Sequence, residues 1–151
     1  MPYTYEYPRP AVTVDAAVFR ASESGYEVLL IRRGNEPFRG MWALPGGFVN
    51  MDETLEEAVA RELKEETSLD GVEMEQLHTF SAVNRDPRHR TISTVFYGIL
   101  NNSSMEAEAG DDASETRWFH IGSLPPMAFD HNRVIGMAVK RIGKPVMPGE
   151  L

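Results

Sequence analysis

One short stretch of this chain limits how it can fold, because it holds both a helix start and a dense group of carboxylates. Thr54-Leu55-Glu56-Glu57 has the form of a capping box, in which Thr54 caps the helix and Glu57 reaches back to the backbone. Apolar residues then recur at helical spacing, at positions 55, 58, 59 and 63. The stretch therefore predicts a helix that begins at Leu55.

The carboxylates of this helix lie on an unusual side of it. Six acidic residues fall within the fourteen positions from Glu53 to Glu66. Three of them, Glu62, Glu65 and Glu66, are spaced i, i+3 and i+4, which places them on one face. At about 100° per residue they fall within or beside the apolar stripe. Charges on an inward face are costly unless they are paired or bound to a metal, so we expect a cation between these glutamates.

Two interpretations of the glutamates are open. The plain one is a solvated helix rich in Glu and Lys. The other is a metal site, favoured by the placement on the apolar side, by the preceding Gly46-Gly47 turn, and by the i,i+4 pair of Arg61 and Glu65. Hard oxygen ligands at this spacing suit Mg²⁺ or Mn²⁺. Mg²⁺ commonly takes one or two carboxylates and leaves its other positions to water and substrate phosphate.

The segment from Gly47 to Leu69 resembles the signature of the Nudix hydrolases, G-x(5)-E-x(7)-R-E-U-x-E-E-x-G-U, where U is a bulky aliphatic residue. Eight fixed positions match over twenty-three residues: Gly47, Glu53, Arg61, Glu62, Leu63, Glu65, Glu66 and Leu69. One position departs, because Ser68 stands where the family has the glycine that ends the helix. A left-handed residue is easiest for glycine, so we expect Ser68 to cost stability or shift the helix end without abolishing catalysis.

Other motifs extend the resemblance from about Tyr5 to about Ile142. They lie at positions 32–34, 37–49, 76–80, 84–88 and 124–131, and they are similar to the ADP-ribose pyrophosphatase branch of the family. They are also similar to the Nudix part of related regulators of NAD metabolism. The resemblance implies an α/β fold, namely the α/β/α sandwich of the Nudix family with a mixed sheet, and it also implies a homodimer.

The resemblance assigns the metal ligands and the substrate contacts of the acidic segment. Glu62, Glu65 and Glu66 are the expected ligands of Mg²⁺ or Mn²⁺. We expect the backbone of Gly46 and Gly47 to contact the substrate or to supply a further carbonyl ligand.

Supporting roles fall to Arg61 and Glu53. Arg61 is expected to hold a neighbouring carboxylate, Glu53 or Glu65, and so to orient it. Glu53 is either a ligand, a helper in catalysis, or a carboxylate that favours the helix N-terminus. The general base is open between a glutamate of the box, Glu62 or Glu65, and an acid of a distant loop. The acids of that loop, each more often solvated than catalytic, are Glu106, Glu108, Asp111 and Asp112.

Arginines are candidates for contact with the phosphates or ribose of a substrate, because Arg suits bidentate phosphate recognition. The candidates are Arg32, Arg33, Arg85, Arg88 and Arg90. For the last three, an arginine-rich turn paired with Asp86 and solvent is an equally good interpretation, and the first two carry the same ambiguity.

An adenine base would need a stacking partner, although aromatic residues more often belong to the core. The candidates are Phe38, Trp42, Phe48 and Phe80. The four histidines show no metal-ligand spacing with one another, and we interpret them as structural or surface residues.

Length and composition bound the class of protein. The 151 residues suffice for one domain, with a core over about 5–142 and a tail over 143–151. The absence of cysteine excludes a disulfide framework and a thiolate ligand or nucleophile. A net charge of −8 without an evident basic patch argues against a nucleic-acid partner. A divalent metal reconciles this acidic chain with an anionic substrate, a small nucleoside diphosphate derivative.

The start of the chain and its hydropathy bear on location. The first ten residues lack the basic and apolar regions of a signal peptide. No apolar run approaches the length that spans a membrane. We therefore expect a cytoplasmic protein without a membrane partner.

The remaining pattern predicts a mixed α/β order. Strands are predicted at Ala11–Phe19, Tyr26–Arg32, Val72–Ala82, Thr91–Leu100 and Thr116–Ile121. A polar, acidic loop is predicted at Asn101–Ser114, and Asp130 is predicted to cap a final helix that runs to about Ile142.

Three hypotheses of function follow. The first is Mg²⁺-dependent hydrolysis of a nucleoside diphosphate linked to another moiety, with ADP-ribose giving AMP and ribose 5-phosphate. The second is the same chemistry on NADH, a nucleotide sugar, a dinucleoside polyphosphate or a damaged nucleoside triphosphate. The third is a non-catalytic sensor that binds ADP-ribose and controls transcription. Related regulators carry a winged helix after the Nudix part, which we expect this chain to be too short to hold, and the near-intact acidic box favours catalysis.

Overall fold

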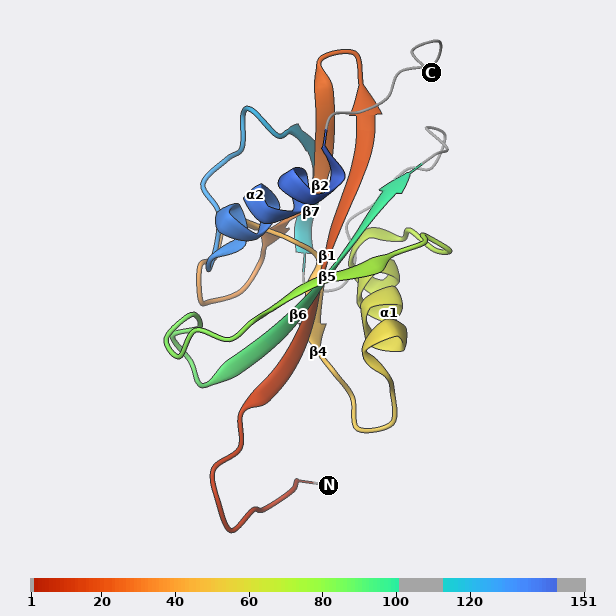
Figure 1. The fold of residues 1–151 in the computed structure, drawn as a ribbon. Coiled ribbons are helices and arrows are strands. Elements are labelled where there is room, and N and C mark those ends of the chain that lie inside the picture. Colours follow the sequence, from red (N-terminus) through yellow and green to blue (C-terminus); the bar gives the residue numbers. More distant parts are fainter. Residues whose placement is uncertain (1, 101–112, 144–151) are drawn as a thin grey trace.

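The computed structural model describes residues 2–100 and 113–143. Within them, one sheet of seven strands is flanked by two helices (Figure 1). The elements in chain order are β1 (Ala11–Ser22), β2 (Gly25–Arg33), β3 (Trp42–Ala43), β4 (Gly46–Phe48), α1 (Leu55–Thr67), β5 (Glu75–Phe80), β6 (Thr91–Leu100), β7 (Ala113–His120) and α2 (His131–Ile142).

The sheet is mixed, as predicted. Its strands follow the order β3-β2-β1-β6-β5, with β4 paired to β1 and β7 paired to β2. The long central strands β1 and β6 run parallel, from the pair Ala11–Thr91 to the pair Arg20–Leu100. The other pairings are antiparallel.

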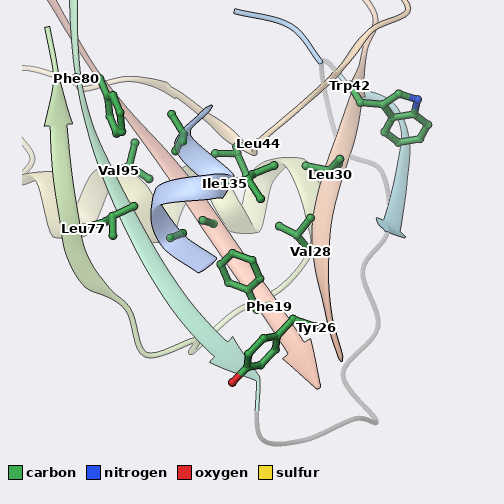
Figure 2. Packing of buried hydrophobic residues seen from close by; sticks show 13 residues of the cluster. Phe19, Tyr26, Val28, Leu30, Trp42, Leu44, Leu77, Phe80, Val95 and Ile135 are labelled. Atoms are coloured by element: carbon green, nitrogen blue, oxygen red, sulfur yellow. The ribbon is translucent and has the colours of Figure 1, made fainter. Parts of the chain in front are cut away.

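The central strand β1 is apolar on both faces, because each face carries a helix. Its alternate residues Ala17 and Phe19 join one buried cluster, which packs against Ile135 and its neighbours on α2 (Figure 2). Val14 and Val18 point the other way, into a cluster that includes Leu63 and other residues of α1. The two helices therefore cover opposite faces of the sheet (Figure 1), which confirms the predicted α/β/α sandwich.

Helix α1 begins as the capping box predicts. The Thr54 hydroxyl accepts a hydrogen bond from the Glu57 backbone N–H at 3.1 Å, and the Glu57 carboxylate accepts one from the Thr54 N–H at 3.0 Å. Ser68 ends the helix in the left-handed region, with φ of 68°. The helix therefore ends at the predicted position, although a non-glycine residue has to adopt this conformation.

The prediction of a turn at Gly46-Gly47 was wrong, since these residues form strand β4 beside β1. The two strands are close, because a Cβ at Gly46 would lie 2.2 Å from the Val14 carbonyl oxygen. Glycine is therefore required here for close approach of the backbones rather than for a turn. Strand β3, which is two residues long, was also not predicted from the sequence.

Other boundaries differ from the prediction. The predicted strand Val72–Ala82 is reduced to β5, because the ladder with β6 extends only from Glu75 to Phe80. Strand β7 begins at Ala113, so the end of the predicted loop belongs to the sheet. The rest of that loop, residues 101–112, lies outside the described residues.

The final helix α2 occupies its predicted range, but its start differs. Asp130 is the residue before α2, and its side chain makes no capping hydrogen bond. Both carboxylate oxygens bind Arg85 instead, at 2.7 and 3.1 Å. No helix in the described ranges is long and apolar enough to cross a membrane.

Candidate active site

Arg61 is the centre of a group of carboxylates on α1 and the loop before it. Its guanidinium donates to both oxygens of Glu53, at 2.6 and 2.9 Å, and to the Phe48 carbonyl at 3.1 Å. One nitrogen, Nη1, also bridges Glu62 at 2.8 Å and Glu65 at 3.1 Å. The cation expected between the glutamates is thus, in part, an arginine of the same helix.

The pKa values of Glu53 and Glu62 shift in opposite directions. Hydrogen bonds from Arg61, and from the Asn50 backbone, lower the pKa of Glu53 from 4.5 to about 2. Burial raises the pKa of Glu62, and the hydrogen bond from Arg61 only partly opposes this. The hydrogen bond to Glu53 raises the pKa of Arg61, which therefore stays charged. Glu62 is consequently a desolvated carboxylate that gains from a nearby cation.

Strand β4 places its glycines directly against the glutamates of α1. The Gly46 N–H donates to Glu66 at 3.0 Å. A Cβ at Gly47 would lie 2.5 Å from a carboxylate oxygen of Glu62. The absence of a side chain at Gly46 and Gly47 therefore lets Glu62 and Glu66 approach the backbone of the sheet.

A pocket of about 400 Å³ opens at this place. Gly46, Gly47, Glu62 and Glu66 line it, together with Arg61. Glu65 is more exposed than Glu62, with 46% of its side chain accessible against 13%. The structure thus brings two of the three predicted metal ligands to the pocket, while Glu65 contacts Arg61 near the surface.

The donor set of the pocket fits a hard divalent cation. Among the described residues, no three acidic or histidine side chains converge into a formed metal site. Two partly buried carboxylates, Glu62 and Glu66, are nevertheless the ligand number that Mg²⁺ commonly takes from a protein when phosphate and water complete its shell. The role of Glu65 as a third ligand remains a prediction.

The predicted substrate arginines lie in different environments. Arg85 and Arg88 line the pocket, but each is paired with an aspartate: Arg85 with Asp130 at 2.7 Å and Arg88 with Asp86 at 2.8 Å. Only 5% of the Arg85 side chain is exposed, against 38% for Arg88. Arg88 is therefore the more accessible of the two to a ligand.

The Arg88–Asp86 pair also shifts the pKa values of its members. Burial opposes the ionisation of Asp86, yet the hydrogen bonds from the Arg88 side chain and backbone lower its pKa overall. The same hydrogen bond raises the pKa of Arg88. Both groups stay charged at neutral pH. This agrees with one of the two interpretations given above, an arginine-rich turn whose arginine pairs with Asp86.

The arginines at the end of β2 point in different directions. Arg33 lines the pocket and donates to the Pro37 carbonyl at 2.7 Å. Arg32 donates to the Gly40 carbonyl at 3.1 Å and lies 3.8 Å from Glu115. Since successive residues of a strand alternate in direction, Arg33 is better placed than Arg32 to contact a ligand in the pocket.

Arg90, just before β6, makes a long contact of 3.5 Å with the Thr91 carbonyl.

The aromatic candidates divide between the core and the pocket. Trp42 and Phe80 belong to the buried core. Phe48 lines the pocket with 44% of the residue exposed, and Phe129, which the sequence analysis did not select, lines it as well. Arg88 lies over both rings, 5.6 Å from the centre of Phe48 and 5.9 Å from that of Phe129. Phe38 packs against Phe129 with ring centres 4.9 Å apart.

Comparison with known proteins agrees with this geometry. The sequence profile of the NUDIX domain matches residues 9–136. This chain belongs to the Nudix hydrolase family. It is 48% identical, over 85% of its length, to an ADP-ribose pyrophosphatase of Methanocaldococcus jannaschii, and it spans 73% of that protein.

Solved Nudix structures share the fold. The Nudix domain of Shewanella oneidensis NrtR, in complex with ADP ribose, superposes with a TM-score of 0.84 at 32% identity, over 91% of each chain. Shewanella oneidensis NrtR complexed with a 27mer DNA gives a TM-score of 0.71 at 32% identity, over 87% of this chain and 61% of that one. A bifunctional NMN adenylyltransferase/ADP ribose pyrophosphatase of Francisella tularensis, complexed with AMP and a Mn ion, gives 0.79 at 30% identity. This chain spans 44% of that protein, and 92% of this chain is covered.

The Nudix pocket also contains two buried polar residues to which the sequence analysis gave no role in the site. Asp15 and His131 both line it, yet they are only 7% and 4% exposed. Asp15 is a charged residue in the middle of an apolar strand, and that is a signal the sequence did offer. The acids at 106, 108, 111 and 112, the alternative general bases, lie outside the described residues.

Proposed function

We propose that this Nudix protein hydrolyses ADP-ribose with the help of Mg²⁺ or Mn²⁺. Water adds to one phosphorus of the diphosphate, the bond from that phosphorus to the bridging oxygen breaks, and the bridging oxygen leaves with the other phosphate. The products are AMP and ribose 5-phosphate. The chemistry requires little beyond positioning and charge neutralisation.

The observation that carries the proposal is the pairing of carboxylates with glycine backbone in one pocket. Glu62 and Glu66 lie against Gly46 and Gly47, and Arg61 holds the neighbouring acids in place. The two carboxylates beside the glycines would repel a diphosphate at this end of the pocket, so a metal ion between them would favour its binding. The identity of 48% to an archaeal ADP-ribose pyrophosphatase supports ADP-ribose as the substrate.

Each residue has a role that follows from its contacts. Glu62 and Glu66 would hold the metal ion, with Glu65 as the predicted third ligand. A metal ion held there would neutralise charge on the phosphates and make water a better nucleophile. Arg61 orients Glu53 and Glu62 through direct hydrogen bonds, and Arg33 and Arg88 stand where they can contact the anionic ligand.

The test is a panel of substrates with purified protein, in the presence and absence of Mg²⁺, with products resolved by chromatography. The panel contains ADP-ribose, NADH, a sugar nucleotide, a diadenosine polyphosphate and deoxynucleoside triphosphates. A Glu62→Gln plus Glu66→Gln variant removes the two charges at the pocket. Glu56→Gln is the matched control, because Glu56 lies on the same helix, is exposed, and accepts a hydrogen bond from Gln76 away from the pocket lining.

We expect metal-dependent release of AMP and ribose 5-phosphate, lost in the double variant and retained in the control. If another compound of the panel is hydrolysed instead, the proposed chemistry stands and that compound replaces ADP-ribose as the substrate. Binding of ADP-ribose without turnover of any compound would favour the sensor, a role consistent with the likeness to the NrtR Nudix domain that binds ADP ribose.

A further inference from the structure

His131, the first residue of α2, has one ring nitrogen whose role is fixed by the backbone. The Leu44 N–H donates to Nδ1 at 3.0 Å. A backbone N–H can only donate, so Nδ1 must be an acceptor and a neutral ring carries its hydrogen on Nε2. Burial lowers the pKa of His131, which agrees with a neutral ring.

The other nitrogen faces Asp15 across a gap. Nε2 lies 3.8 Å from the Asp15 Oδ2 atom, which is too far for a direct hydrogen bond. The same oxygen accepts a hydrogen bond of 2.6 Å from the buried Ser93 hydroxyl, which holds the carboxylate in place. Only 6% of the His131 side chain and 11% of the Asp15 side chain are exposed. A buried donor and a buried acceptor thus face each other without a direct bond, at the wall of the pocket.

This pair lies next to the carboxylates of the Nudix box. Asp15 and Gly46 are partners in the β1–β4 ladder, and a Cβ at Gly46 would lie 2.3 Å from the Asp15 Oδ1 atom. The N–H of the same glycine donates to Glu66. Gly46 therefore separates the Asp15–His131 pair from Glu66, and a group bound between Asp15 and His131 is close to the diphosphate position.

We propose that Asp15 and His131 form a specificity-determining subsite for a sugar hydroxyl of the substrate. A hydroxyl is both donor and acceptor, so it can donate to Asp15 and accept from the Nε2–H of His131. The inference rests on the proposed function, because it names the part of the substrate that this site reads. A substrate without the hydroxyl leaves the Nε2–H of His131 without that acceptor and Asp15 with Ser93 as its remaining donor, and loss of such buried hydrogen bonds is how polar sites discriminate strongly.

The experiment compares ADP-ribose with two analogues. One lacks the hydroxyls of the distal ribose, and the other lacks the 2′-hydroxyl of the adenosine. We measure kcat/KM with Mg²⁺ and, separately, the dissociation constants by calorimetry. We expect one analogue to be worse by about 10- to 100-fold, as for an unsatisfied buried pair. The analogue with the lower kcat/KM shows which sugar, the distal ribose or the ribose of adenosine, contacts Asp15 and His131.

Two variants test the residues. Asp15→Ala removes the carboxylate acceptor that faces His131, together with its bond to Ser93. His131→Asn keeps an acceptor for the Leu44 N–H but removes the Nε2 donor. In both variants, we expect the ratio of kcat/KM for ADP-ribose to that for the affected analogue to shrink to a few-fold, because the hydroxyl no longer has both partners. His120→Asn is the matched control: its Nδ1 also accepts from a backbone N–H, that of Gly122, but it lies away from the pocket.

The outcomes separate this inference from the proposed function. The subsite would be overturned if the unchanged protein had the same kcat/KM and dissociation constant for ADP-ribose and both analogues. It would also be overturned if the variants, while folded, lowered kcat/KM for all three compounds by the same factor. The latter would show a structural role only, with thermal unfolding as the check on folding. If nothing is hydrolysed, the proposed function fails, but the calorimetric ratio of ADP-ribose to its analogues still decides whether the hydroxyl is read.

Discussion

The two helices of this protein begin in different ways, although the sequence predicts a side-chain cap for both. Thr54 and Glu57 at the start of α1 bind each other's backbone within four positions of the chain. Asp130 at the start of α2 binds Arg85, 45 positions away, and His131 binds the backbone of Leu44, 87 positions away. The start of α1 is thus held by local contacts, and the start of α2 is held by the rest of the fold.

The difference matters for function because the long-range contacts of α2 shape the pocket. Arg85 and His131 both line it. The helix therefore serves partly to hold polar side chains in place, and its first residues contribute to the site rather than to a cap. Four measurements test this contrast.

The largest effect is expected at the long-range anchor of α2. Arg85→Ala leaves the Asp130 carboxylate without its partner in a partly buried place, and we expect a loss of about 3 kcal/mol in the free energy of unfolding. Urea denaturation measures it. The double variant with Asp130→Ala should recover part of the loss, because the unpaired charge is then gone. A loss below about 1 kcal/mol would mean that the pair behaves like a surface ion pair.

Acidification should affect α2 through His131. Its pKa in the folded protein is lowered from 6.5, so the unfolded chain binds the proton first. Stability from this group is complete above about pH 6.5 and declines as the pH falls below it, by at most about 1.4 kcal/mol per pH unit. Urea denaturation between pH 8 and pH 5 measures the slope, and His131→Asn should reduce it. If the free energy of unfolding depends on pH as steeply in that variant, a group other than His131 causes the dependence.

Removing the local cap of α1 should have a smaller effect. Thr54→Ala loses one hydrogen bond to the Glu57 N–H, at an exposed position, and we expect a loss of about 1 kcal/mol. Denaturation at neutral pH measures it, with Thr54→Ser as the control that retains the hydroxyl. If Thr54→Ala costs as much as Arg85→Ala, the contrast between the two helix starts is wrong.

The smallest effect is expected at the other end of α1. Ser68→Gly relieves the left-handed conformation at φ of 68° but makes the unfolded chain more flexible, so we expect a net gain of about 0.5 kcal/mol. The same denaturation experiment measures it. A loss of stability would show that the side chain of Ser68 contributes more than its backbone strain costs.

Much of the fold could be predicted because it depends on local pattern. The start of α1 and the placement of Glu62 and Glu66 toward the sheet follow from spacing along the chain, whereas the parallel pairing of β1 with β6 was not predicted. The site was only partly predicted. The sequence predicts one carboxylate partner for Arg61, which binds three, and it predicts a turn at Gly46-Gly47, which form a strand.

What the sequence determined by itself is the set of interactions whose partners lie within one or two helical turns. The Thr54–Glu57 box and the Arg61–Glu65 pair are of this kind, because helix geometry alone brings those atoms together. Only the tertiary structure decided that Asp15 faces His131, that Arg85 takes the carboxylate of Asp130, and that β4 presses two glycines against Glu62 and Glu66. Those partners meet because the sheet and both helices pack in one particular way, and no spacing along the chain encodes that arrangement.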